Sequence, residues 1–364
     1  MTDIAFYAPM KAPDDPVPSG DRTMGRALLA ALEGAGLGFV SVASRLRSRD
    51  GVGDAASQDR IFREAEAEIA RLSAGPKPDL WLTYHSYYKA PDLIGPRIAR
   101  LWSIPYAIVE GTRASSRLTG PYARFAKAAE AACDAADVIF TLTDYDREAL
   151  ERDRVGGQQI VGLRPFLASE ALPPQPPRHD PSDTTRLLAC AMFRSGDKLA
   201  SYSALASALA LVQSTDWTLD IVGDGPVRAE VEGLFSRFAE KVSFLGALDA
   251  NGVAAQMGKS DLLVWPGIGE AFGMVYLEAQ AQGCPVLAED RQGVRDVVRD
   301  GGWLVPANDP AAYAKAIDRL VGNPRECAAR GERGRKQIAV DHLLPAARAA
   351  LAAELAPLLR EQRR

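Results

Sequence analysis

Cysteine and histidine are scarce in this sequence, which limits the kinds of site that it can form. The 364 residues include four cysteines and three histidines, and none of these form a CxxC, HxxxH or HExxH pair. Zinc sites and disulfide frameworks usually depend on such spacings. We therefore expect reduced thiols in the core and no metal site built on histidine and cysteine.

Long apolar runs and a strong excess of one charge are also absent. The sequence has no stretch of about 18 apolar residues that would span a membrane, and its start lacks the basic and apolar regions of a signal peptide. The formal net charge of -4 gives no electrostatic reason to expect nucleic acid as a partner. We expect a cytoplasmic protein and leave open a peripheral contact with the inner face of a membrane.

What the chain does contain is a regular alternation of short apolar runs and helical patterns. This alternation predicts parallel sheets covered by helices, which makes the fold class α/β of the doubly wound type. The expected strands are residues 4–7, 39–42, 79–83, 106–109, 138–142, 187–191, 218–222, 242–244, 262–265, 286–288 and 303–305. The clearest expected helices are residues 24–34, 60–72, 199–212, 226–239 and 274–282.

A proline-rich stretch divides the chain. Residues 164–183 hold six prolines and show no periodicity, which is typical of an extended connector between domains. We expect a Rossmann-like domain at 1–165, a linker at 166–182 and a second Rossmann-like domain at 183–342. The final helix, about 343–364, is expected to pack back on the first domain. The ligand is expected at the carboxyl ends of the strands, in the crevice between the domains.

The strongest local signal is a glycine-rich turn between a strand and a helix. Residues 262–266 predict the strand, 267–273 the turn and 274–281 the helix. Free backbone N–H groups at the positive end of a helix suit a diphosphate without a metal ion. Glu270 and Glu278 are spaced to reach opposite ends of an extended ligand and to accept hydrogen bonds from sugar hydroxyls. Taken alone, the segment is explained equally well as a tight turn before a helix.

Residues 270–279 read Glu-Ala-Phe-Gly-Met-Val-Tyr-Leu-Glu-Ala and are followed by Gly-Cys-Pro-Val at 283–286. This segment closely resembles the EX7E motif of family 4 glycosyltransferases, which have the GT-B fold. The resemblance continues through 221–226, 242–246 and 293–305. It implies a retaining transferase of the glycosyl transferases group 1 type that takes a UDP- or GDP-type nucleotide-sugar donor. It also implies a front-face mechanism that needs neither a metal nor another cofactor.

The resemblance assigns roles to single residues. Glu278 would bind the ribose of the donor, and Glu270 would hold hydroxyls of its sugar. The remaining donor contacts would come from Phe272, Gly273 and Met274 at the diphosphate, from Gly223 in a glycine turn, and from Leu245 and Gly246 near the base. Arg194 and Lys198 fill the places of two cations that stabilise the leaving diphosphate, as a metal-free site requires. The alternative for such an isolated cation is a solvated loop charge.

The first half of the chain matches the family less completely. Gly20 and Arg22 lie in a segment that resembles the glycine loop approaching the donor phosphates. In the competing interpretation, Ser19 or Asp21 simply caps the next helix. The same choice applies to Asp144, which follows the strand expected at 138–142.

The family's usual active-site histidine has no counterpart here. Glu110 and Arg113 follow the strand where that histidine is expected, and His85 ends the preceding strand. We keep His85, Glu110 and Arg113 as candidates for binding the acceptor or the donor sugar, with a structural role as the alternative. The missing histidine also leaves open a catalytically degenerate, nucleotide-sugar-binding or partner-dependent subunit.

The acceptor, which could be a glycan, a glycolipid or a small molecule, is not specified by any motif. Tyr122, Arg124, Phe125 and Lys127 would suit a basic-aromatic surface for lipid-linked or anionic acceptors, or they form one ordinary exposed helix face. An inverting GT-B transferase or an epimerase is a further alternative. It would need an in-line base, and the spacing of Glu270 and Glu278 speaks against it.

Overall fold

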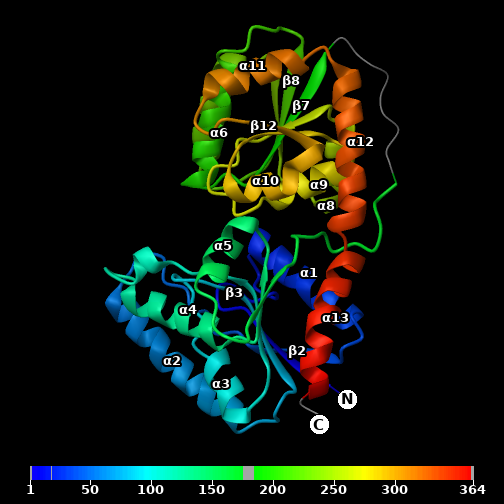
Figure 1. The fold of residues 1–364 in the computed structure, drawn as a ribbon. Coiled ribbons are helices and arrows are strands. Elements are labelled where there is room, and N and C mark those ends of the chain that lie inside the picture. Colours follow the sequence, from blue (N-terminus) through cyan, green and yellow to red (C-terminus); the bar gives the residue numbers. More distant parts are fainter. Residues whose placement is uncertain (1, 18, 175–183, 362–364) are drawn as a thin grey trace. The chain divides into compact units, whose positions relative to one another are not determined.

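A computed structural model describes residues 2–17, 19–174 and 184–361 of the chain. The chain forms two compact units (Figure 1). Unit 1 comprises Met1–Ala168 together with Leu344–Arg364, and unit 2 comprises Ser169–Leu343. Of the linker predicted at 166–182, residues 175–182 lie outside the described residues.

Unit 1 is built on a six-stranded parallel sheet in the order β2-β1-β3-β4-β5-β6. Its strands are β1 (Asp3–Tyr7), β2 (Phe39–Ser44), β3 (Leu80–Ser86), β4 (Tyr106–Gly111), β5 (Val138–Thr141) and β6 (Gln159–Gly162). Its helices are α1 (Gly20–Gly34), α2 (Ala55–Ser73), α3 (Gly95–Trp102), η1 (Ser115–Arg117), α4 (Ala123–Ala135), α5 (Asp144–Arg152) and α13 (Leu344–Glu361). In Figure 1, α1 and α13 lie on one face of this sheet, and α2, α3 and α4 lie on the other.

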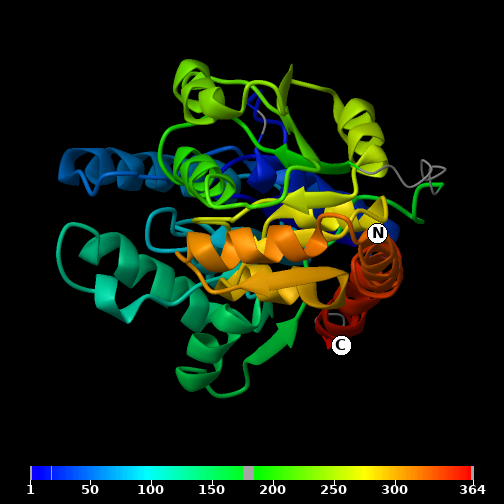
Figure 2. The ribbon, with the colours of Figure 1, turned by 90° about the horizontal axis from the view of Figure 1, so that it is seen from above.

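Unit 2 holds a second six-stranded parallel sheet, in the order β12-β11-β10-β7-β8-β9. Its strands are β7 (Thr185–Cys190), β8 (Trp217–Val222), β9 (Val242–Gly246), β10 (Leu262–Val264), β11 (Val286–Glu289) and β12 (Gly302–Val305). Its helices are α6 (Asp197–Leu209), α7 (Arg228–Phe235), η2 (Ser236–Phe238), α8 (Ala250–Lys259), α9 (Met274–Ala281), α10 (Gln292–Val298), η3 (Arg299–Gly301), α11 (Pro310–Leu320) and α12 (Pro324–Asp341). Helix α6 packs with α7 and α11, and α11 also packs along β12 (Figure 2).

Each sheet contains one place where the direction of winding reverses. This switch point lies between β1 and β3 in unit 1, and between β7 and β10 in unit 2. The loops that follow two such strands leave the sheet toward opposite faces, so a crevice opens between them at the carboxyl edge of the sheet. The two switch points are therefore the first places to examine for ligand sites.

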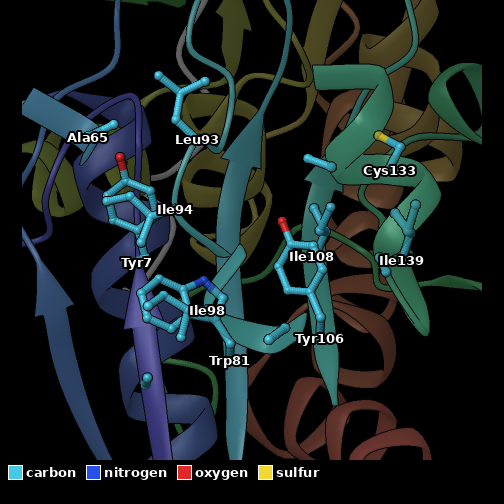
Figure 3. Packing of buried hydrophobic residues seen from close by; sticks show 14 of the residues in the cluster. Tyr7, Ala65, Trp81, Leu93, Ile94, Ile98, Tyr106, Ile108, Cys133 and Ile139 are labelled. Carbon is cyan, nitrogen blue, oxygen red and sulfur yellow. The ribbon is translucent and has the colours of Figure 1, made fainter. Parts of the chain in front are cut away.

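Large aromatic side chains fill the core of unit 1 beneath its switch point. Tyr7, Trp81 and Tyr106 are almost completely buried, and Figure 3 shows them on neighbouring strands beside isoleucines of α3 and β4. Each donates a hydrogen bond: Tyr7 Oη to Leu46 O at 2.9 Å, Trp81 Nε1 to Thr83 Oγ1 at 2.9 Å, and Tyr106 Oη to Asp92 Oδ2 at 2.8 Å. A buried polar group without a partner would destabilise the fold, so these bonds also fix the rings.

Helix α13 brings the end of the chain back to unit 1, where it packs on α1. Leu351 and Leu355 of α13 are fully buried. The fit is close where α1 ends, because a Cβ placed on Gly34 would lie 2.2 Å from Nε of Arg348. No helix among the described residues is long and apolar enough to cross a membrane.

The doubly wound fold class is confirmed, and a strand is present at every predicted place. The sequence interpretation missed β6, because this edge strand is short and its first and last residues are exposed. The helix predicted at 226–239 is wrong as a single element, since a turn precedes α7 and η2 follows it. Helices α1 and α2 begin before 24 and 60, because Ser19 and Asp54 accept hydrogen bonds from backbone N–H groups and cap them.

Candidate functional site

The switch point of unit 2 brings two predicted site residues into direct contact. Lys198 lies in the first turn of α6, and Glu270 lies on the turn after β10. The Lys198 ammonium donates to Glu270 Oε1, and Nε1 of the buried Trp265 donates to the same oxygen at 3.1 Å. The ammonium also lies 5.7 Å from the centroid of the Trp265 ring. Glu270 is therefore held by two donors, and Lys198 is charge-balanced by Glu270 in this structure.

The turn that carries Glu270 depends on glycine. Gly267, Gly269 and Gly273 have φ angles of 77°, 69° and 83°, which side-chain-bearing residues rarely adopt. A Cβ on Gly267 would lie 2.2 Å from Oη of Tyr276, and that hydroxyl donates to Trp265 O at 3.1 Å. Space and backbone conformation thus both require the predicted glycine-rich turn.

Helix α9 begins directly after this turn and presents an uncapped amino end. Gly273 occupies the N-cap position without a side-chain cap, and the first turn of α9 contains no acidic residue. Phe272 is buried and Met274 is half-buried, so the backbone of both is held against the unit. Free N–H groups and the helix dipole make such an end attractive to an anion.

Glu278 lies on α9 and faces the carboxyl end of β7. Burial raises the pKa of the Glu278 carboxyl. Burial also raises the pKa of the Cys190 thiol to about 12, and the charge of Glu278 adds to that rise. Within the described residues, the Glu278 carboxylate makes no hydrogen bond or ion pair, so its oxygens remain available as acceptors for ligand hydroxyls.

The other residues predicted for the donor follow β7, β8 and β9. Arg194 is exposed in the loop after β7. Gly223 N donates to Gly246 O at 2.9 Å, and a Cβ on Gly223 would lie 2.0 Å from Ala191 O. The loops after these three strands are therefore packed together, and Leu245 is exposed beside them.

The switch point of unit 1 brings His85 and Glu110 together with Asp21. His85 Nδ1 lies 2.6 Å from Asp21 Oδ1 and 3.8 Å from Glu110 Oε2. We call these three side chains the Asp21–His85–Glu110 group. Among the described residues, Asp21 Oδ2 and Glu110 Oε2 are buried and have no hydrogen-bond partner. The sequence interpretation considered Asp21 only as a helix cap, so its contact with His85 was missed.

The backbone of this group is unusual. His85 and Glu110 have φ angles of 61° and 60°, in the left-handed region that non-glycine residues seldom occupy. They lie near the ends of the neighbouring strands β3 and β4, where Thr112 N donates to Ser86 O at 3.0 Å. Such conformations are of order 1–3 kcal/mol less favourable and concentrate at functional sites. The strained backbone is a signal of function that the sequence does not display.

Burial and neighbouring charges together give His85 and Glu110 raised pKa values. Burial by itself would lower the pKa of His85, but the carboxylates of Glu110 and Asp21 raise it to about 9. Burial raises the pKa of Glu110 to about 7, against the opposing charge of His85. Burial likewise raises the pKa of Asp146 on α5, whose carboxylate interacts with His85. Both His85 and Glu110 therefore hold a proton to higher pH than the free side chains do.

Gly20 and Arg22 lie in the first turn of α1. Ser19 caps this helix, because its Oγ accepts from Arg22 N at 3.2 Å. Gly20 is exposed and a Cβ there would meet nothing within 4 Å, so the structure shows no steric need for glycine. Asp144 is the first residue of α5, and the neighbouring Thr143 supplies the side-chain cap.

Two sets of candidates from the sequence lie elsewhere. Arg113 donates to Glu130 at 2.6 Å and to Asp134 at 2.7 Å, so α4 holds it away from the Asp21–His85–Glu110 group. The basic-aromatic surface proposed for 122–127 is wrong, because Tyr122 and Phe125 are buried. Of its basic members, Arg124 lies over the ring of Phe62, and Lys127 is exposed.

All four cysteines are free thiols. Three of them, Cys133, Cys284 and Cys327, are buried, and Cys190 is half-buried at the end of β7. Burial fits the expectation of core thiols for three of the four, and Cys190 is the exception. Among the described residues, no three or more histidine, cysteine, aspartate or glutamate side chains are arranged to hold a metal ion.

Sequence comparison links unit 2 to a known family. Residues 186–323 match the family described as Glycosyl transferases group 1. The chain is 45% identical over 114 residues to phosphatidyl-myo-inositol mannosyltransferase of Mycobacterium leprae (strain TN), across 30% of this chain and 29% of that protein. It is 26% identical over 298 residues to D-inositol 3-phosphate glycosyltransferase of Frankia alni, across 71% and 70%. The M. leprae match thus spans less than a third of that protein. The names of both relatives support the prediction of a transferase.

Structural comparison extends the likeness to the whole chain. Sucrose-phosphate synthase from Thermosynechococcus elongatus superposes with a TM-score of 0.74 at 21% identity, over 99% of both chains. HepE of Anabaena, solved in complex with UDP and glucose, superposes with a TM-score of 0.69 at 14% identity, over 98% of this chain and 100% of HepE. Likeness at these identities bears on the fold, which is the predicted GT-B arrangement of two Rossmann-like units. The chain therefore has the GT-B fold, and its residues 186–323 match the family described as Glycosyl transferases group 1.

Proposed function

We propose that the protein is a retaining glycosyltransferase, which moves a sugar from a nucleoside diphosphate to an acceptor hydroxyl without a metal ion. The observation that carries the proposal is the contact of Lys198 with Glu270 beside the uncapped amino end of α9. HepE, which has the same fold, binds UDP and glucose, and this supports a donor of that kind. The M. leprae and F. alni relatives carry inositol compounds in their names, whereas the acceptor here is proposed only as a glycan, a glycolipid or a small molecule.

The donor would extend along the carboxyl edge of the unit 2 sheet. Glu278, whose carboxylate makes no bond within the described residues, would accept hydrogen bonds from the ribose hydroxyls. The N–H groups at the start of α9 would face the diphosphate. Lys198 has three N–H donors, so it can keep its bond to Glu270 and still donate to a phosphate oxygen. Glu270 Oε2, which receives neither of those two bonds, would accept from a sugar hydroxyl.

In the proposed reaction the bond between the sugar C1 and the diphosphate oxygen breaks while the acceptor oxygen bonds to C1 on the same face. The acceptor proton passes to the departing phosphate oxygen, so no protein base is needed. Charge accumulates on the leaving diphosphate, where Lys198, Arg194 and the helix amides would stabilise it. Donors that are already oriented toward developing charge contribute most to such a step.

A thermal-shift screen against UDP, GDP, ADP and TDP sugars tests the donor site, because a ligand of the folded state raises the unfolding temperature. One nucleotide series should stabilise the wild type and Glu240→Ala, a control at an exposed glutamate of unit 2. Glu278→Ala should lose most of that shift. An equal shift in all three proteins would place the nucleotide elsewhere and refute this site.

A second candidate is a subunit that binds the donor but has lost transfer, and the presence of Glu110 where the family has histidine favours it. Hydrolysis of the donor by the isolated chain separates the two functions. Turnover that continues in EDTA and releases the sugar in the donor's own anomeric form supports the retaining, metal-independent enzyme. Binding without turnover supports the degenerate subunit, and a strict requirement for Mg²⁺ or Mn²⁺ would overturn the metal-free mechanism.

A further inference from the structure

A row of aromatic rings continues from His85 through the half-buried Tyr87 and Tyr88 to the buried Tyr122. The ring centroids of His85 and Tyr87 are 4.8 Å apart, those of Tyr87 and Tyr88 are 5.6 Å apart, and those of Tyr88 and Tyr122 are 5.2 Å apart. Tyr87 and Tyr88 are only half-buried, so their rings are partly accessible. The row begins at the Asp21–His85–Glu110 group.

Three cations surround the far end of this row. The Lys89 ammonium lies 5.6 Å from the Tyr88 centroid and 5.9 Å from the Tyr122 centroid, and the Arg117 guanidinium lies 5.1 Å from the Tyr88 centroid. Burial raises the pKa of the Tyr87 hydroxyl, and the nearby Arg49 guanidinium opposes that rise. Within the part of the chain that the structure describes, Arg49, Lys89 and Arg117 form no ion pair with a carboxylate. We call these three cations with Tyr88 and Tyr122 the tyrosine–cation cluster.

Asp50, whose charge acts on Tyr122, forms its hydrogen bonds outside this cluster. Asp50 is buried, and its Oδ2 accepts from Gln58 Nε2 at 2.9 Å. Its Oδ1 accepts from the backbone N–H groups of Val52 and Gly53 at 3.0 and 3.2 Å. These bonds stabilise the loop after Arg49 and occupy both oxygens. Asp50 therefore forms no direct ion pair with the three cations, although its negative charge acts on Tyr122.

The segments that carry the cluster are held in place by the backbone. Tyr87 and Ala90 exchange two backbone hydrogen bonds of 3.3 and 2.9 Å, which close a tight turn directly after β3. Asp50 N donates to Lys89 O at 2.8 Å and joins this turn to the loop after β2. A ligand would thus meet a largely preformed surface and would lose less free energy to ordering the protein.

We propose that unit 1 binds its acceptor between these two features, and that the acceptor is a polyhydroxylated ring bearing an anionic group such as a phosphate. The anionic group would bind to Arg49, Lys89 and Arg117, because a cation–ring contact at an exposed site is weaker than a charge-assisted hydrogen bond to phosphate. Ring hydroxyls would meet the Asp21–His85–Glu110 group, in which the buried atoms Asp21 Oδ2 and Glu110 Oε2 accept no hydrogen bond from the protein. The inference rests on the proposed function, since it names the acceptor of that reaction.

The phosphate could belong to a soluble sugar phosphate or to a lipid headgroup, and the experiment has an arm for each source. Binding of glucose 6-phosphate, glucose and inorganic phosphate to the full chain is measured by calorimetry for the wild type, Lys89→Gln and Arg117→Gln. Binding to phosphatidylglycerol and phosphatidylcholine vesicles is measured for the same proteins by sedimentation. Lys77→Gln is the matched control, because Lys77 is an exposed lysine of the same unit that precedes β3 instead of following it.

The wild type and Lys77→Gln should bind one phosphate-bearing probe more tightly than its neutral counterpart, by at least about tenfold in Kd. That pair is either glucose 6-phosphate and glucose, or phosphatidylglycerol and phosphatidylcholine vesicles. Lys89→Gln and Arg117→Gln should each weaken that binding by about tenfold. Equal binding of charged and neutral probes, no binding of any probe, or equal weakening by Lys77→Gln would overturn the inference. Nucleotide binding is measured for the same proteins. A wild type that binds no nucleotide counts against the proposed function. A wild type that binds nucleotide but shows no preference for phosphate-bearing probes counts only against this inference.

Discussion

The two units carry their candidate sites at the same place in the topology, but one site is formed mainly by backbone and the other mainly by side chains. At the unit 2 switch point, glycine backbone forms the turn and a helix end, and Lys198 and Glu270 balance each other. At the unit 1 switch point, side chains dominate, and His85 and Glu110 occupy backbone conformations that glycine would adopt more easily. The diphosphate site that we propose in unit 2 would therefore be formed mainly by backbone, whereas the acceptor site that we propose in unit 1 would be formed by charged side chains.

This difference has a physical consequence for how each site tolerates change. A site made by backbone N–H groups is preserved as long as the turn keeps its shape, so it depends on the space around its glycines. A site made by charged side chains depends on its protonation state and on each individual residue. The following predictions test that contrast, beginning with the largest expected effect.

Replacement of Lys198 by alanine should lower turnover of the donor by about 100- to 1000-fold, as expected when one group that stabilises developing charge is removed. The stability of unit 2 should change little, because Glu270 keeps the hydrogen bond from Trp265. Lys315→Ala, at an exposed lysine of α11, is the matched control and should keep full activity. The rates of donor hydrolysis by the wild type and both variants are compared under identical conditions. Near-normal turnover by Lys198→Ala would show that Lys198 does not stabilise the leaving diphosphate.

Gly293→Ala should destabilise unit 2 by ~1–3 kcal/mol through overpacking behind the turn. A Cβ on Gly293 would lie 1.4 Å from Ala271 O, so α10 or the turn must move. Gly20→Ala in unit 1 is the contrasting variant, because its Cβ would meet nothing within 4 Å. Thermal unfolding followed by circular dichroism should show a lower midpoint for Gly293→Ala alone; similar midpoints would mean that the unit 2 turn is less constrained than its glycines suggest.

The stability of unit 1 should fall as the pH rises from about 6.5 to about 9. The folded protein raises the pKa of His85 to about 9, so over this range it holds a proton that the unfolded chain releases. The stabilisation is complete below pH 6.5 and is lost as the pH passes through 9. Glu110→Gln removes one of the two carboxylates that raise this pKa and should flatten the fall by a few degrees in unfolding temperature.

Glu148→Gln, at an exposed glutamate of α5, serves as the control for that pH series and should follow the wild type. A wild-type unfolding temperature that does not change between pH 6.5 and 9 would contradict the shifted pKa of His85. It would also weaken the contrast between a side-chain site in unit 1 and a backbone site in unit 2.

Unit 2 was the easier half to interpret from sequence, and the structure explains why. A glycine that must adopt a positive φ, such as Gly267 or Gly273, is visible in the sequence because few other residues fit there. Regular apolar runs likewise predicted the central strands, whereas β6 at the edge lacks such a run. The contact between Lys198 and Glu270 joins residues far apart in the chain, and only the folded sheet brings them together.

Unit 1 was harder because its informative features are three-dimensional. Nothing in the residues around His85 and Glu110 indicates a left-handed backbone, and Asp21 belongs to a helix that begins after a different strand. Tyr122 and Phe125, together with Arg124 and Lys127, suited either a basic-aromatic surface or one ordinary exposed helix face. Both are buried, since α4 turns its aromatic residues toward the core.

The return of α13 to unit 1 has a consequence for folding during synthesis on the ribosome. Strands β1 to β6 are translated first, but the helix that covers α1 is encoded after all of unit 2. At about 5–20 residues per second, residues 169–343 take roughly 10 to 35 seconds to synthesise. During that interval the surface of α1 that α13 later covers is exposed to chaperones and to other nascent chains. Unit 1, whose sheet is translated before unit 2, is thus completed only after unit 2 has been synthesised.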